Sequence, residues 1–262
     1  MQKILLLGTI SVEEGKIVSS AAYVAAGLSK LGLNAAVFAK ISSENSGIIR
    51  DFFAKNSIDD EMLFAVEKPC EFDYSGVSAV FITGDFVADD FGFNFAKDLC
   101  KKCESLEIPV VFDPGNIGEF ADKVNETAKN VTVFVPSTED AEKLCGLCEA
   151  EKIAEHYLGL GARKIVVTLD KQGALYKSRV ECGRAPTFRA DKVVDTTGAG
   201  DAFAAGLISG IAEELPLSEA VVRANACGCI AIQHEGFYMP NSGALREYML
   251  SHRFVVDGCK EF

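Results

Sequence analysis

Short apolar segments alternate with longer amphipathic segments along the first two thirds of this chain, and no other feature of the sequence restricts the fold as strongly. Six short segments rich in Val, Ile and Phe are predicted strands: residues 3–7, 35–39, 77–82, 110–112, 131–135 and 164–169. Between them, apolar residues recur at helical spacing over residues 18–31, 46–56, 91–106 and 117–129. The alternation predicts an α/β fold with a mostly parallel central sheet and helices on both of its faces.

The last third of the sequence changes character. Residues 174–176 and 180–182 are expected to pair as a hairpin, residues 188–194 to form a short strand, and three helices to follow near 199–213, 218–233 and 243–252. Neither a linker rich in Pro, Gly or Ser nor an internal repeat interrupts the chain, so we predict a single domain over residues 1–262. Ligands of open sheets bind beyond the carboxyl ends of the strands, where the chemistry is therefore expected.

Charge and composition exclude several classes of function. The chain carries 26 Lys and Arg against 38 Asp and Glu, a formal charge of −12, which disfavours nucleic acid or a membrane surface as a partner. The longest charge-free stretch, residues 17–29, is shorter than the roughly 20 apolar residues that span a bilayer, and the apolar run before Gly8 is too short for a secretion signal. Nine scattered cysteines are expected to be free thiols, so the sequence predicts a cytoplasmic protein.

The glycine-rich segment Asp-Thr-Thr-Gly-Ala-Gly-Asp at residues 195–201 lies between a strand-like run and a predicted helix. A glycine-rich turn at a helix start leaves backbone N–H groups free and directs the positive end of the helix dipole outward, which favours phosphate. Gly198 and Gly200 would let the backbone approach such an anion closely. Asp201 would repel phosphate, which is understandable if it accepts the proton of an attacking hydroxyl as general base. The alternative is an Asp that only stabilises the helix dipole.

Residues 195–203 closely resemble the second signature of the ribokinase family, the PfkB-type carbohydrate kinases. The resemblance implies a ribokinase-like three-layer sandwich and ATP-dependent transfer of a phosphoryl group to the hydroxyl of a small sugar or sugar-like metabolite. It also implies that Gly198, Ala199 and Gly200 form the anion hole and that Asp201 is the catalytic base.

Two further segments resemble the nucleotide-binding landmarks of this family. Residues 166–174 are similar to its strand-end Thr-Leu-Gly-x-x-Gly-Ala, which implies that Thr168, Asp170 and Gly173 lie near ATP, with Asp170 where a Gly is usual. Residues 224–236 are similar to the late helix and glycine beside the adenine, which implies roles for Asn225 and Gly236. A plainly exposed Asn225 is the alternative. The resemblance also implies a K⁺ site near Asp195 and Thr197.

Residues 135–141 stand where the family organises Mg²⁺ through a Pro-Asn-x-x-Glu motif. The resemblance implies that Asp140 is the magnesium-associated acid, or Glu139 if the register shifts by one residue. A carboxylate oxygen is a suitable ligand for Mg²⁺. The alternative is that Ser137 caps a helix whose first turn contains these two acids.

The early substrate motif of the family is altered in this chain. Glu13 stands at the position of its substrate-binding Asp and Tyr23 at that of its Asn, and Tyr23 cannot make the paired amide contacts of Asn. Asp113 and Asn116 belong to a third substrate segment that here lacks its Arg. The segments that hold the family's lid are short, so we predict a reduced or absent lid, and a monomer or a homodimer that the lid does not mediate. We also predict poor activity on ribose or fructose and a preference for an acceptor with an aromatic, cationic or extended substituent.

Two alternatives stay open at this point. The C-x-x-C pairs at Cys100/Cys103 and Cys145/Cys148 could bind zinc, although their helical spacing favours packing in the core. The chain could also be a non-catalytic member of the same fold that binds a nucleotide or metabolite. Asp201 argues against that second alternative, because a binding protein gains nothing from a carboxylate beside phosphate.

Overall fold

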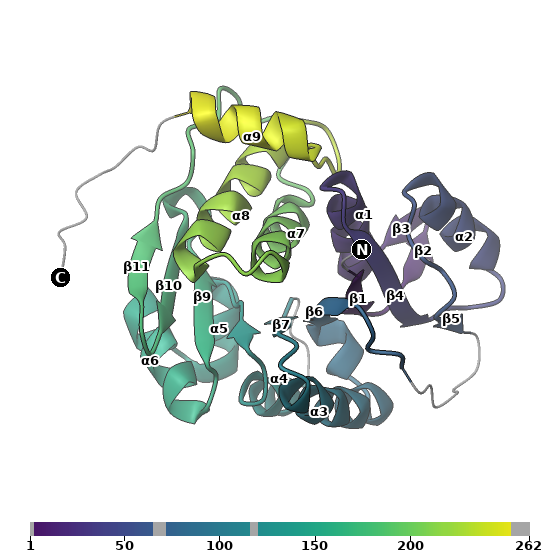
Figure 1. Cartoon of the computed structure of the whole chain (residues 1–262), viewed down its shortest axis with the longest axis horizontal. Coiled ribbons are helices and arrows are strands. Elements are labelled where there is room, and N and C mark those ends of the chain that lie inside the picture. The colour runs from purple at the N-terminus through teal and green to yellow at the C-terminus, as the bar shows by residue number, and fades with distance from the viewer. Residues whose placement is uncertain (1–2, 65–71, 116–119, 253–262) are drawn as a thin grey trace.

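The computed structural model describes residues 3–64, 72–115 and 120–252, and one nine-stranded sheet runs through them (Figure 1). The strands of this sheet are β1 (Lys3–Leu7), β4 (Asn34–Lys40), β5 (Leu63–Phe64), β6 (Val77–Thr83), β7 (Val110–Asp113), β8 (Val133–Phe134), β9 (Lys164–Thr168), β10 (Ala174–Ser178) and β11 (Cys182–Ala185). They lie in the order β11-β10-β9-β8-β7-β6-β1-β4-β5. All neighbours from β9 to β5 pair in parallel, and β10 pairs antiparallel with β9 and β11. The predicted mostly parallel sheet is confirmed.

Helices cover both faces of the sheet and complete the three layers. One face carries α1 (Ser20–Lys30), α2 (Ser46–Lys55), α7 (Ala199–Ala212), α8 (Leu217–Ala231) and α9 (Ser242–Ser251). The other carries the short 3-10 helix η1 (Gly84–Val87), α3 (Asp90–Ser105), α4 (Ala121–Ala128), α5 (Thr138–Cys145) and α6 (Ala150–Leu160). A second 3-10 turn, η2 (Asp170–Gln172), follows β9.

The central strands are buried on both sides, as expected for a parallel sheet between two helical layers. In β1, Ile4 and Leu6 pack in the core beneath α1 and α7, whereas Leu5 and Leu7 pack in the core above α3 and α6. All four side chains are at most 2% exposed. This double burial explains why the strand sequences are continuous apolar runs and do not alternate with polar residues.

A two-stranded hairpin, β2 (Ser11–Glu13) paired with β3 (Lys16–Val18), lies outside the main sheet. Glu14 and Gly15 connect its strands with positive φ values of 50° and 76°, the geometry of a tight hairpin turn. The sequence predicted no strand here, because three-residue strands are too short to show a period. The hairpin occupies one of the two short segments where the lid was expected to be reduced or absent, and whether it serves as a lid stays a prediction.

The predicted strand at residues 188–194 is wrong. These residues pair with no strand in the described part of the chain, and Val193 and Val194 are 65% and 49% exposed. The backbone N–H groups of Val194 and Asp195 instead bond the carbonyl of Ile232, at the end of α8. Local β propensity cannot make a strand where the tertiary structure offers no partner edge.

The cysteine pairs differ from each other. Cys100 and Cys103 are buried on α3, as the core alternative predicted. The second pair is not within a helix, because α5 ends at Cys145 and Cys148 is exposed beyond it. Over the described ranges no cluster of three or more His, Cys, Asp or Glu side chains is arranged to hold a metal ion. A search of the same ranges also found no helix with the length and apolar character needed to cross a bilayer.

Candidate active site

The glycine-rich turn at residues 195–201 enters α7, and two side-chain hydrogen bonds of Asp195 hold its shape. Its Oδ1 accepts the N–H of Thr197 at 2.9 Å and its Oδ2 accepts the N–H of Gly236 at 2.9 Å. These bonds to the charged form lower the pKa of Asp195. The carboxylate therefore joins the turn to the loop after α8, two segments about 40 residues apart in sequence.

Gly198 and Gly200 have different structural reasons to be glycine. Gly198 is the N-cap of α7 with a φ of 75°, and a Cβ placed there would lie 2.8 Å from Cδ2 of Phe237. A Cβ on Gly200 would meet no atom of the described residues within 4 Å. The N–H of Ala199 bonds the Thr196 carbonyl within the turn at 3.2 Å. The following N–H groups of the first helical turn have no acceptor within their own helix and are open to an anion.

Asp201 lies in this first turn of α7 and is only partly exposed. Burial raises its pKa to about 7, although a hydrogen bond from the Ser20 side chain at the start of α1 favours the charged form. A carboxyl group with a pKa near 7 can exchange a proton at neutral pH, which a general base must do. The first turns of α1 and α7 thus meet at this side chain.

Asp113, at the end of β7, is the second carboxyl group with a strongly changed pKa. Burial and, to a lesser extent, the nearby carboxylates of Asp140, Asp201 and Asp85 together raise its pKa to about 7, against the bond from the Gly115 N–H to its Oδ1 at 2.9 Å. Three carboxyl groups therefore lie within electrostatic reach of Asp113: Asp85 after β6, Asp140 in the first turn of α5 and Asp201 in the first turn of α7. Asn116, the other residue expected in this segment, lies outside the described residues.

The two acids expected to associate with Mg²⁺ begin α5. Ser137 caps the helix, since its Oγ accepts the Asp140 N–H at 3.0 Å, and Asp140 Oδ2 accepts the Ser137 N–H at 3.0 Å and its hydroxyl at 2.6 Å. This reciprocal cap is the alternative weighed from the sequence. Glu139 is exposed in the same turn. Asp140 is therefore held beside Asp113 by the cap, with both of these bonds on the same oxygen.

The residues expected near the nucleotide follow β9. Thr168 ends the strand and its N–H bonds the Pro136 carbonyl at 3.0 Å. Asp170 adopts a φ of 48°, which explains why Gly is usual at this position. Gly173 has a φ of 86°, and a Cβ there would lie 2.1 Å from the carbonyl oxygen of Ala185. The turn after β9 is consequently packed directly on the end of β11.

Asn225 is neither exposed nor free to bind a ligand with its amide N–H₂ group. It is 5% exposed on α8, and its Nδ2 donates to the carbonyls of Ala185 at 2.8 Å and Pro186 at 3.2 Å. The exposed alternative is therefore wrong. Asn225 and Gly173 both contact the backbone at Ala185 and Pro186, where β11 ends.

On the acceptor side, Glu13 is exposed on β2, whereas Tyr23 on α1 is partly buried. Burial raises the pKa of the Tyr23 phenol, and the charge of Asp201 raises it further, which places this side chain near the candidate base. The phenol donates to the Ile17 carbonyl at 2.5 Å, and the ring stacks on Phe237. Tyr23 thus contacts the protein with both its ring and its hydroxyl.

A cavity of about 510 Å³ at the carboxyl ends of β1, β4 and β6 contains residues that the sequence analysis missed, including Thr9, Lys40, Asp85 and Phe86. Asp85 accepts the Thr9 N–H at 3.1 Å and also the hydroxyls of Thr9 and Thr83. Asp85 follows the end of β6 by two residues, so the rule that ligands bind at strand ends could have identified it.

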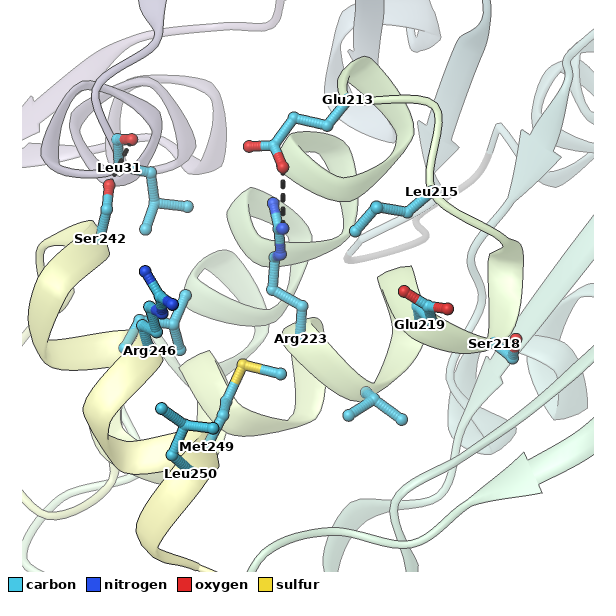
Figure 2. Close-up of a pocket in the computed structure, with 12 residues that line it drawn as sticks. Leu31, Glu213, Leu215, Ser218, Glu219, Arg223, Ser242, Arg246, Met249 and Leu250 are labelled. Atoms are coloured by element: carbon cyan, nitrogen blue, oxygen red, sulfur yellow. Dashed lines mark hydrogen bonds and ion pairs between the residues drawn. The ribbon is translucent and has the colours of Figure 1, made fainter.

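Figure 2 shows a larger cavity, about 730 Å³, at the opposite ends of α1 and α7. Leu31 and Arg246 line it, and Arg223 extends along its wall to an ion pair with Glu213 at 2.8 Å. None of the candidate catalytic or nucleotide residues lines this cavity. The candidate active site is therefore defined by the acids around Asp113 and by the glycine-rich turn, and the larger cavity in Figure 2 is not part of it.

A comparison with family models matches residues 72–242, more than half of the chain, to the model described as "pfkB family carbohydrate kinase". Among curated proteins, the 2-dehydro-3-deoxygluconokinase of Bacillus subtilis (strain 168) is 37% identical over 134 residues, which are 50% of this chain and 41% of that protein. The matched segments span less than half the length of the first such relatives.

Solved structures share the fold across nearly the whole chain. The aminoimidazole riboside kinase of Salmonella enterica, complexed with aminoimidazole riboside and an ATP analogue, has a TM-score of 0.77 at 20% identity, covering 95% of this chain and 100% of that one. The fructokinase of Vibrio cholerae O395, bound to fructose, ADP and a calcium ion, has a TM-score of 0.79 at 20% identity, covering 95% and 99%. The expected ribokinase-like sandwich is confirmed by these neighbours.

Proposed function

Because the chain belongs to the pfkB family of carbohydrate kinases, we propose that it transfers the γ-phosphoryl group of ATP to a hydroxyl of a small sugar-like metabolite. The observation that carries this proposal is Asp201, a partly buried carboxyl group with its pKa raised to about 7, placed in the helical turn that follows a glycine-rich anion-binding loop. A structural helix-dipole Asp gains nothing from burial, whereas a general base is most efficient when its pKa lies near the working pH.

In this mechanism Asp201 takes the proton of the acceptor hydroxyl as the hydroxyl oxygen attacks the γ-phosphorus. The backbone N–H groups of the 198–200 turn stabilise the negative charge on the equatorial phosphoryl oxygens, assisted by the dipole of α7. Ser20 orients the base through its hydrogen bond to the Asp201 carboxylate. Asp195 keeps the turn in the required shape by bonding Thr197 and Gly236.

The nucleotide lies between the turn after β9 and the loop after α8. Thr168, Asp170 and Gly173 supply the first wall, and Thr197 and Gly236 supply the second. The support for this arrangement is that Gly173 packs against the Ala185 carbonyl that also accepts the Asn225 amide, so one packed segment joins both walls. Asn225 acts here by holding that segment.

The electrostatics of the site favour Mg²⁺, although the described residues contain no ready cluster of three or more metal-binding side chains. The four neighbouring carboxyl groups would repel a polyphosphate, and a divalent cation, when bound, neutralises the charge on the β- and γ-phosphates. Asp140 would hold it, or Glu139 in the alternative register, and the Ser137 bonds to Asp140 Oδ2 leave Oδ1 of that carboxylate without a bond from the cap. A K⁺ site at Asp195 and Thr197 stays a prediction. Each Asp195 oxygen already accepts one backbone N–H, so a cation there would share these oxygens with the turn.

The acceptor is expected to be something other than free ribose or fructose. The Tyr23 hydroxyl donates its one hydrogen bond to the Ile17 carbonyl, so it has no donor left for the vicinal hydroxyls of a sugar. An acceptor with an aromatic, cationic or extended substituent suits a site with a short hairpin and several carboxylates, where Glu13 or Asp113 can meet a positive group. We expect a monomer, or a homodimer formed without the hairpin.

An assay of ATP consumption with Mg²⁺ across sugars, sugar acids, nucleosides and aminated sugars tests the proposal. Replacing Asp201 by Asn should lower kcat by about 10² to 10⁴-fold while the dissociation constant of ATP changes little, because the base acts on the transition state. Asp98→Asn, an exposed acid on α3, is the matched control. A variant that keeps more than about half of the wild-type kcat would show that Asp201 is not the base.

The competing function is nucleotide or metabolite binding without catalysis. It predicts that the wild-type protein binds ATP and turns over no member of the panel. Calorimetric titration of the wild-type protein with ATP, together with the panel assay, separates this outcome from the kinase.

A further inference from the structure

The β2–β3 hairpin is too short to be stable without support. Each strand contributes three residues, and an isolated two-stranded hairpin is at best marginally stable in water. Only Ile17 is buried within it, and Val18 is 45% exposed. Contacts with the rest of the protein must therefore hold the hairpin in place.

Two hydroxyl groups at the start of α1 provide such contacts. Tyr23 Oη donates to the Ile17 carbonyl of β3 at 2.5 Å, and Ser19 Oγ donates to the Thr9 carbonyl, just before β2, at 2.7 Å. Ser19 is also the N-cap of α1, so its position is set by the helix. Of these two residues, Tyr23 is the one that also reaches the phosphoryl-binding side of the site.

The ring of Tyr23 connects the hairpin to the glycine-rich turn through Phe237. The two rings stack with centroids 4.9 Å apart and an interplanar angle of 23°, while Phe52 of α2 meets Tyr23 edge-on at 6.0 Å. Phe237 lies so close to Gly198 that a Cβ on Gly198 would be 2.8 Å from its ring and 3.3 Å from its Cα. The adjacent Gly236 is bonded to Asp195. Continuous contacts thus run from β3 to the turn that precedes the candidate base.

We propose that Tyr23 is a positioning residue that holds the reduced hairpin at a fixed place relative to Asp201 and the 198–200 turn, and thereby orients the acceptor hydroxyl. This inference rests on the proposed kinase function. The Tyr23 hydroxyl holds the hairpin through Ile17, and the Tyr23 ring contacts Phe237 beside the glycine-rich turn. Because burial and the Asp201 charge both raise the phenol pKa, the hydroxyl stays a donor throughout the neutral pH range.

Tyr23→Phe removes the bond to Ile17 and keeps the stacked ring. The expected result is a KM for the acceptor raised about fivefold, the effect of losing one hydrogen bond, with the KM for ATP within about twofold of wild type. Tyr157→Phe is the matched control, because it also removes a hydrogen-bonded phenol hydroxyl, bonded to Asn125 at 2.9 Å, but on α6, in the core on the opposite face of the sheet from Ile17. Equal rises in both KM values, or an unchanged acceptor KM, would overturn the proposal.

A double-mutant cycle tests the stacked pair. Tyr23→Leu and Phe237→Leu should each lower kcat/KM, and the double variant should lose at least about twofold less than the product of the single losses, because the second substitution removes a contact already broken. Strictly multiplicative losses would show that the two rings act separately and would contradict the connection.

Hydrogen exchange supplies a readout that does not depend on activity. Amides of residues 11–18 should exchange faster in Tyr23→Phe than in wild type or in Tyr157→Phe, because the hairpin loses its support. If no acceptor on the panel is phosphorylated by wild type, the proposed function fails, and the exchange result still decides whether Tyr23 holds the hairpin. Unchanged exchange at residues 11–18 would rule that out.

Discussion

Replacing Asp113 by Asn should raise the free energy of unfolding relative to wild type, and this gain should grow as the pH rises from 4 to 8. In the folded protein, burial and the neighbouring carboxylates raise the pKa of Asp113 from 3.8 to about 7. Between these two pH values the folded chain binds more protons at this site than the unfolded chain does, so the free energy of unfolding falls as pH increases. At 1.36 kcal/mol per pKa unit, this single group sets a ceiling of about 4 kcal/mol on the loss. Asn has no charge to bury and its Oδ1 can still accept the Gly115 N–H.

The assay is urea unfolding of wild type and Asp113→Asn at several pH values from 4 to 8. The difference in unfolding free energy, variant minus wild type, should grow with pH by a few kcal/mol and level off above pH 8. Asp98→Asn, at a carboxyl that is 82% exposed, should show a difference that hardly changes with pH. A flat difference for Asp113→Asn, or one that falls as pH rises, would refute the raised pKa of the carboxyl group at the end of β7.

Three further predictions concern the nucleotide and phosphoryl side of the site. If Asp201 is the base, its pKa of about 7 means that about a tenth of the enzyme has the ionised carboxylate at pH 6 and about nine tenths at pH 8. The value of kcat/KM should therefore rise about tenfold between pH 6 and pH 8, and a pH profile without this rise would contradict the assignment. Gly173→Ala should destabilise the protein by several kcal/mol in thermal unfolding, because its Cβ would meet the Ala185 carbonyl at 2.1 Å and its φ is 86°; an unchanged melting temperature would be inconsistent with this packing. Gly200→Val should fold normally, since a Cβ there meets no described atom, yet weaken ATP binding at least about tenfold in calorimetry; normal ATP affinity would place the anion site elsewhere.

Repeating patterns in the sequence predicted most of the architecture. Strands such as β1 and β6 are continuous apolar runs because both of their faces are buried, and helices such as α1 and α3 show apolar residues at helical spacing because one face packs on the sheet. The errors fall where the pattern was too short or lacked a partner. The hairpin at residues 11–18 has three-residue strands, and residues 188–194 have strand-like composition but no edge to join.

Individual side chains were harder to assign than the segments that contain them. Residues 195–201 could be located from their glycines and the helix that follows, since these are local properties. Asn225 was recognised as unusual, but its bonds to Ala185 and Pro186 involve residues about 40 positions away. Asp85 and Phe237 were both missed, although Asp85 could have been found from its place just after a predicted strand, whereas Phe237 belongs to no local motif.

The sequence by itself determined the alternation of strands and helices, the mostly parallel sheet and the position of the glycine-rich turn before α7, because each depends on residues that are neighbours in the chain. Only the tertiary structure decided that Asp113 and Asp201 have pKa values near 7 and that Tyr23 lies between Ile17 and Phe237. Burial, the proximity of like charges and the stacking of rings depend on which distant segments the fold brings together. The order of the strands and the packing of α1 on α7 settle those distances, and no period in the sequence encodes them.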